Sequence, residues 1–134
     1  NTLVPHDAPA DERSIALFER LRKIGFSTCL ISNNKEPRVT PFADALKTIY
    51  VYKAGKPKPG GYREGMRRLG TGKSNTLFVG DQLFTDVWGA NLAGIHSILV
   101  KPMNPKEEIQ IVLKRYLEKP VLYCYLQRQR RGLR

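Results

Sequence analysis

The chain has 134 residues, of which 41% are hydrophobic and 26% are charged, and its formal net charge is +11. This length and composition fit one globular domain and exclude a wholly disordered, collagen-like or coiled-coil chain. No apolar run approaches the ~18 residues that span a bilayer. The two cysteines are too few for a disulfide framework, which favours the cytoplasm.

Helical and strand patterns alternate along the chain. Helices are predicted where apolar residues recur at helical spacing, and the first has Asp11 as candidate N-cap and Gly25 as stop. Strands are predicted at short apolar and β-branched runs. In chain order we predict a helix over 10–24, a strand over 26–31, a helix over 37–46, a strand over 49–52, a helix over 59–69, a strand over 76–79, a helix over 85–93, a strand over 95–100, and a helix over 106–119 that Pro120 breaks or kinks.

This alternation predicts a doubly wound, Rossmann-like α/β domain, with a parallel sheet covered on both faces. Ligands in such folds bind beyond the carboxyl ends of the strands. The residues that follow three of the predicted strands are Ser32 with Asn33, then Lys56, and then Asp81 with Asp86. A hydroxyl, backbone N–H groups and a lysine can hold phosphate oxygens, and carboxylates are oxygen ligands that suit Mg²⁺. Together they predict a magnesium phosphoryl-transfer site.

These segments resemble three motifs of the haloacid dehalogenase (HAD) superfamily of aspartate-nucleophile phosphatases. They are 29–34 (Cys-Leu-Ile-Ser-Asn-Asn), 56–59 (Lys-Pro-Lys-Pro) and 80–86 (Gly-Asp-Gln-Leu-Phe-Thr-Asp). Within the superfamily, the chain resembles the YqeG-type branch, which is related to the mitochondrial phosphatidylglycerophosphate phosphatases. The resemblance implies a HAD-like phosphatase core over 1–105, followed by a separate C-terminal region over 106–134.

The resemblance also implies a role for each matching residue. Ser32, Asn33 and Lys56 would bind the phosphoryl group, Asp81 would bind Mg²⁺, and Asp86 would bind or orient the metal.

The first motif of the superfamily is Asp-x-Asp-x-Thr, at the end of the central strand of the sheet. Thr2 matches its last residue, so the nucleophilic aspartate and the general acid/base would both lie before Asn1. Without a central strand, two apolar strands would expose unpaired edges to each other. We therefore expect the chain to be part of a longer protein that supplies this strand and both aspartates.

The spacing between the motifs bears on the size of the substrate. The intervals from Thr2 to Ser32 and from Ser32 to Lys56 each hold one helix and one strand, so neither has room for a cap domain. A capless, open site favours a bulky substrate, either a macromolecule or a lipid phosphate such as phosphatidylglycerophosphate. A small phosphate ester held at a homo-oligomer interface is also compatible with it.

The positive charge is concentrated at the end of the chain. Nine basic and three acidic residues lie from Lys101 to Arg134. The predicted basic amphipathic helix and tail over 106–134 suit an anionic membrane surface, which would place the protein at the inner face of the membrane. Alternatively, this helix packs on the sheet of its own domain and leaves a solvated basic end. Nucleic acid is less favoured, because no recognised binding fold frames the aromatic residues.

Two functions remain open from the sequence. One is a Mg²⁺-dependent phosphatase that acts through an aspartyl-phosphate. The other is a catalytically inactive adaptor that keeps the fold and binds RNA, the ribosome or a membrane through its basic surface. Aspartates two and four positions before Thr2 would favour the enzyme.

Overall fold

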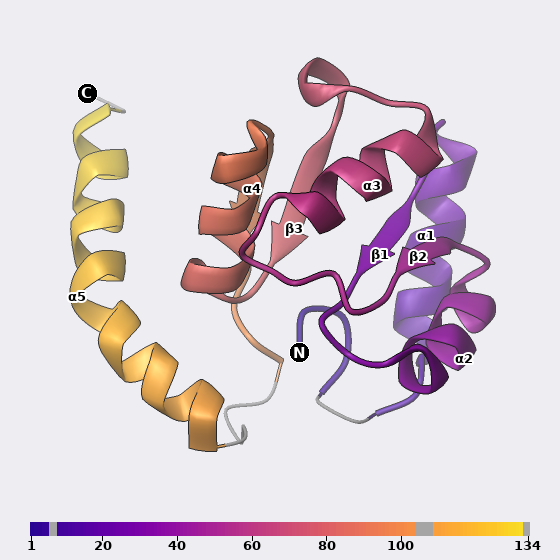
Figure 1. Ribbon diagram of the computed structural model, residues 1–134, viewed down its shortest axis with the longest axis horizontal. Helices are drawn as coiled ribbons and strands as arrows, with labels where there is room; N and C mark the ends of the chain where they lie inside the picture. Colours follow the sequence, from indigo (N-terminus) through magenta and orange to yellow (C-terminus); the bar gives the residue numbers. More distant parts are fainter. Residues whose placement is uncertain (6–7, 104–108, 133–134) are drawn as a thin grey trace.

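Helices and strands alternate along the chain, as the sequence predicts. A computed structural model of the protein describes residues 1–5, 8–103 and 109–132. The elements are α1 (Glu12–Lys23), β1 (Cys29–Ile31), α2 (Glu36–Leu46), β2 (Ile49–Val51), α3 (Gly60–Leu69), the 3₁₀ turn η1 (Lys73–Asn75), β3 (Leu77–Gly80), the π-helical turn η2 (Leu83–Val87), α4 (Trp88–Ala93), β4 (His96–Leu99) and α5 (Ile109–Gly132) (Figure 1).

The four strands form two parallel pairs. Cys29 of β1 lies opposite Ile49 of β2, and Leu77 of β3 lies opposite His96 of β4. The described strands form these two separate pairs and no single continuous sheet. The predicted Rossmann-like α/β class is confirmed, and the break in the sheet is where we expect the central strand of the fold to lie.

Helices α3 and α4 pack together and form the core with the strands behind them. Tyr62, Met66, Ala90, Ala93 and Ile95 are buried in this cluster. Phe78 of β3 packs against it, with its ring edge-on to Tyr62 and the ring centroids 4.9 Å apart. Helices α1 and α2 contact each other, and α2 also contacts β2. The helices thus fix the strands whose carboxyl ends carry the candidate site.

Local signals in the sequence place the ends of α1. The Asp11 side chain accepts a hydrogen bond from the Ser14 N–H at 2.8 Å, and the Ser14 side chain bonds back to the Asp11 N–H at 3.1 Å. This reciprocal cap satisfies two backbone donors that the helix cannot satisfy itself. At the other end, Gly25 has a φ of +96°, a conformation that other residues rarely adopt. The predicted cap and stop are both confirmed.

Most element ends lie close to the predicted ones, and two elements differ further. The predicted helix over 85–93 is a π-helical turn, η2, followed by α4 from Trp88. The last helix continues through Pro120 to Gly132, and Figure 1 shows it bending part-way along. A proline inside a helix removes one backbone hydrogen bond and kinks the helix without having to end it. The predicted start of this helix, at 106–108, lies outside the described residues.

Apolar side chains are exposed on several of the described elements. Leu77, Val79 and Ile98 on one face of the β3–β4 pair are exposed, as are Tyr116 and Leu117 of α5. Figure 1 shows α5 beside the rest of the molecule, next to α4. None of the described helices is long and apolar enough to cross a membrane.

Candidate active site

The carboxyl ends of the strands surround one cavity of about 730 Å³. The predicted site residues that line it are Thr2, Ser32, Asn33, Lys56, Asp81 and Asp86. They come from the opening segment and from the ends of β1, β2 and β3, so residues up to 84 positions apart in sequence share one space. The structure therefore brings every predicted site residue together.

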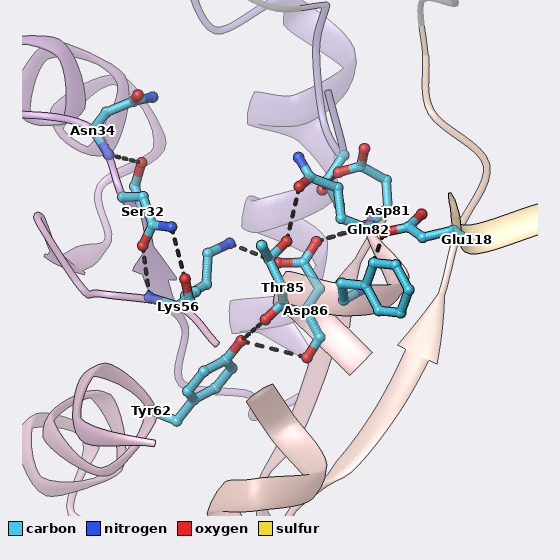
Figure 2. Close-up of polar contacts among 12 residues, drawn as sticks. Ser32, Asn34, Lys56, Tyr62, Asp81, Gln82, Thr85, Asp86 and Glu118 are labelled. Atoms are coloured by element: carbon cyan, nitrogen blue, oxygen red, sulfur yellow. Dashed lines mark hydrogen bonds and ion pairs between the residues drawn. The ribbon is translucent and has the colours of Figure 1, made fainter. Parts of the chain in front are cut away.

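Asp86 is held at the centre of the site by three groups. It is only 3% exposed, and its Oδ1 atom pairs with the Lys56 Nζ atom at 2.6 Å. Its Oδ2 atom accepts hydrogen bonds from the backbone N–H groups of Asp81 and Gln82, both at 3.0 Å (Figure 2). Both carboxylate oxygens are thus engaged with protein groups. This geometry favours the orienting role of Asp86 over direct metal binding.

Asp81 connects the opening segment to the end of β3. The Thr2 Oγ1 atom donates a hydrogen bond to Asp81 Oδ1 at 2.6 Å, across 79 positions of sequence. Asp81 is 5% exposed, and a buried carboxylate is stable only when it is hydrogen-bonded or paired with a charge. The contact places Thr2, the last residue of the predicted first motif, directly against the predicted metal ligand.

Asn33 ties the loop after β1 to the loop after β2. Its Nδ2 atom donates to the Lys56 carbonyl oxygen at 3.1 Å, and its Oδ1 atom accepts from the Lys56 N–H at 2.8 Å. Nearby, the Ser32 Oγ atom accepts from the Asn34 N–H at 3.1 Å, which leaves the hydroxyl proton of Ser32 free to donate. Asn33 was predicted to contact the substrate, but these bonds favour a role in positioning Lys56.

Tyr62 holds the turn between Asp81 and Asp86. The sequence analysis did not predict this role. Its hydroxyl donates to the Thr85 carbonyl oxygen at 2.6 Å. Burial raises the pKa of Tyr62, and the nearby negative charge of Asp86 raises it further. Tyr62 therefore remains a neutral hydrogen-bond donor at physiological pH. No family motif covers position 62, so only the three-dimensional contact reveals this role.

Glu118 of α5 also contacts this turn and was not predicted. Its Oε1 atom accepts a hydrogen bond from the Phe84 N–H at 3.0 Å (Figure 2). Glu118 lies 34 positions beyond Phe84, in the region over 106–134 that was predicted to be separate from the phosphatase core. No spacing or motif signals the contact.

The donor atoms of the site fit Mg²⁺. Buried carboxylate oxygens at a strand end are hard ligands, and Mg²⁺ is commonly held by one or two carboxylates together with water and substrate phosphate. Within the described ranges, no group of three or more His, Cys, Asp or Glu side chains is placed to hold a metal. Asp81 stays the predicted protein ligand, because both carboxylate oxygens of Asp86 are bonded to protein groups.

Cys29 lies at the start of β1, away from the carboxyl end that carries the site, and is not suited to act as a nucleophile. Burial raises the pKa of its thiol to about 11. The thiol is the reactive species only when deprotonated, and near pH 7 almost none of Cys29 is in that form. Covalent chemistry at this site is therefore not expected to use cysteine.

We expect Gly80→Ala to disturb the site through Asp86. A Cβ atom at Gly80 would overlap the Asp86 carboxylate, whereas a Cβ atom at Gly60 would meet no atom within 4 Å. Overpacking of this kind costs about 1–3 kcal/mol of unfolding free energy. Urea unfolding of Gly80→Ala should show this loss, with Gly60→Ala as the matched control. Equal stability of the two variants would contradict the packing of Asp86 described here.

Comparison with known proteins decides the family. Residues 3–94 match the sequence profile of the haloacid dehalogenase-like hydrolases. The chain is also 37% identical over 123 residues to "Probable phosphatase YqeG" of Bacillus subtilis (strain 168), covering 91% of this chain and 72% of that protein. The chain belongs to the haloacid dehalogenase-like hydrolase family. Its predicted place in the YqeG-type branch of HAD phosphatases is confirmed.

Solved structures share the HAD fold with this chain. A HAD phosphatase from Thermococcus onnurineus superposes with a TM-score of 0.62 at 20% identity, covering 75% of this chain and 50% of that protein. An uncharacterized protein from Listeria monocytogenes serotype 4b superposes with a TM-score of 0.58 at 16% identity, covering 75% of this chain and 67% of that protein. The chain thus spans half the length of the Thermococcus phosphatase. These likenesses confirm the HAD-like fold.

Proposed function

We propose that this HAD-family phosphatase depends on Mg²⁺ and hydrolyses a phosphate monoester through an aspartyl-phosphate intermediate. The observation that carries the proposal is the shared cavity of Ser32, Lys56, Asp81 and Asp86. A hydroxyl and an ammonium group on one side, and a buried carboxylate on the other, are the groups that a phosphoryl group and its metal require.

The proposed reaction has two displacements at phosphorus. The aspartate that we expect four positions before Thr2 would attack phosphorus through a carboxylate oxygen, and the bond from phosphorus to the alcohol oxygen would break. The aspartate that we expect two positions before Thr2 would give the departing alcohol a proton and then take one from a water molecule. That water attacks phosphorus, which releases inorganic phosphate and restores the first carboxylate.

The residues of this chain hold the phosphoryl group during both displacements. One N–H of the Lys56 ammonium points at Asp86, and its other two can donate to phosphoryl oxygens. Ser32 supplies a further donor. Asp81 would hold Mg²⁺, which when bound neutralises charge on the phosphoryl oxygens. Asp86 keeps Lys56 in place, because their ion pair is buried and short.

We further propose a bulky substrate, such as phosphatidylglycerophosphate or another lipid phosphate at an anionic membrane surface. The described residues include no cap domain over the cavity. On α5, Tyr116, Leu117, Lys119 and Arg128 are exposed, and aromatic and basic side chains of this kind suit an anionic lipid surface. A small ester at a homo-oligomer interface is the other outcome that an open site allows.

A substrate panel tests the proposal. Protein made from its complete reading frame should release inorganic phosphate from phosphate monoesters only when Mg²⁺ is present. We expect faster release from a lipid phosphate in anionic vesicles than from the same headgroup phosphate free in solution. Release without Mg²⁺ would contradict the metal requirement. No release from any ester would favour the inactive adaptor, which nothing in the described residues otherwise supports.

A further inference from the structure

We infer that Glu118 is a positioning residue that holds the turn between Asp81 and Asp86, and that it makes α5 a working part of the active site. Only the catalytic consequence of this inference rests on the proposed function. The structural part concerns one contact, from the Phe84 N–H to the Glu118 carboxylate at 3.0 Å.

The contact satisfies a donor that the turn cannot satisfy itself. Phe84 is the second residue of η2, and the first N–H groups of a helical turn have no carbonyl partner within it. The residue before η2, Gln82, makes no side-chain capping bond. Glu118 therefore supplies from a distant helix what an N-cap residue normally supplies locally. Its negative charge also suits the positive end of the η2–α4 helix dipoles.

Among the α5 side chains that the structure describes, Glu118 stands out as buried. Glu118 is 6% exposed, whereas its neighbours Leu117 and Lys119 are exposed. Glutamate is rarely buried unless it has a partner, because removing an ionised carboxylate from water is costly. The buried position fits this contact, which is one point where α5 is attached to η2.

The turn that Glu118 holds also carries the catalytic geometry. Within it, Asp86 Oδ2 accepts from the Gln82 N–H, and Thr85 Oγ1 donates to Gln82 Oε1 at 2.8 Å. Tyr62 bonds to the Thr85 carbonyl from the opposite side. Glu118 and Tyr62 thus hold two successive residues of one turn from two different helices. Replacing Glu118 removes the hydrogen bond to the Phe84 N–H, and Asp81 and Asp86 become less well positioned.

Amide hydrogen exchange of the Phe84 N–H tests the contact without any reference to catalysis. In the wild-type protein this amide should be protected although the turn offers it no acceptor. Glu118→Ala should make it exchange about tenfold faster, the loss expected for a bond to a charged acceptor. Glu118→Gln keeps an acceptor oxygen and should retain most of the protection. Lys119→Ala, on the exposed side of the same helix, is the control and should change nothing.

Each outcome decides the inference. Faster exchange in the alanine variant, with protection in the glutamine variant, supports it. Unchanged exchange in Glu118→Ala overturns it, and so does equal loss in the alanine and glutamine variants. If Glu118→Ala does not fold, the wild-type protein and Glu118→Gln still decide the inference. An unprotected Phe84 amide in the wild-type protein overturns it. Protection of this amide in both proteins supports it.

The catalytic consequence has its own measurement. If the protein is a Mg²⁺-dependent phosphatase, Glu118→Ala should raise the Mg²⁺ concentration that gives half-maximal rate, by about tenfold, as expected for a group that supports a metal ligand. Glu19→Ala, which removes a carboxylate at an exposed position of α1, should leave this concentration unchanged. If Glu118→Ala speeds exchange of the Phe84 amide but does not change the Mg²⁺ concentration for half-maximal rate, the structural role of Glu118 is supported and its link to the metal site is rejected.

Discussion

Asp81→Asn should abolish Mg²⁺-dependent phosphate release by the protein made from its complete reading frame. Asparagine keeps an oxygen that can accept the Thr2 hydrogen bond, so the fold should be retained. It removes the negative charge that the proposed metal requires. Metal ions supply several kcal/mol of charge stabilisation in the transition state, so we expect a fall in kcat of about a thousandfold or more.

The matched control is Asp44→Asn, the same chemical change at an exposed position of α2. Steady-state rates across a range of Mg²⁺ concentrations, with circular dichroism to verify folding, separate a metal effect from misfolding. A rate near wild type for Asp81→Asn would refute its role as a metal ligand. A similar fall in Asp44→Asn would show that the loss does not come from the site.

Lys56→Met should cost both activity and stability. Methionine matches the aliphatic part of the lysine side chain but leaves Asp86, which is 3% exposed, without its cation. Breaking a buried ion pair by removing one partner costs about 3–5 kcal/mol. The low end of that range is expected here, because two backbone N–H groups still bond to Asp86. Urea unfolding measures this loss, and phosphate release should fall below detection.

Two further variants sharpen this test. Lys58→Met changes the other lysine of the same motif, which is exposed, and should leave unfolding free energy and rate near wild type. The double variant Lys56→Met with Asp86→Asn removes both charges and should recover part of the lost stability while remaining inactive. Additive stability losses in the double variant would contradict a direct coupling between Lys56 and Asp86.

The sequence predicted the placement of the site because parallel strands bring their carboxyl ends to one edge. Once the strands were located from their apolar runs, Ser32, Lys56 and Asp81 had to lie near one another, whatever the details of packing. This prediction holds even where the predicted end of a strand is wrong by one residue. The end of β3 at Gly80, one residue later than predicted, leaves Asp81 directly after the strand.

The partners of individual side chains were not predictable in this way. Asn33 bonds to the Lys56 backbone, and Asp86 to Lys56, because of distances that only the assembled fold sets. Glu118 is the extreme case, since its partner is a backbone N–H, which carries no sequence signal at all. Periodicity finds elements and strand ends, whereas hydrogen bonds between loops depend on tertiary packing.

The division of the strands into two separate pairs has a consequence for how the molecule holds together. Each pair is joined by a short local connection, β1 to β2 through α2 and β3 to β4 through α4, and such local contacts form quickly. The ion pair of Lys56 with Asp86 joins the end of one pair to the end of the other. This ion pair is therefore one of the contacts that link the two strand pairs, together with the packing of α3 against α4. Enzymes often gain stability when site residues are replaced, because site geometry is strained for function. Replacing Lys56 or Asp86 would instead remove a buried ion pair between the two strand pairs, so a loss of stability is expected here.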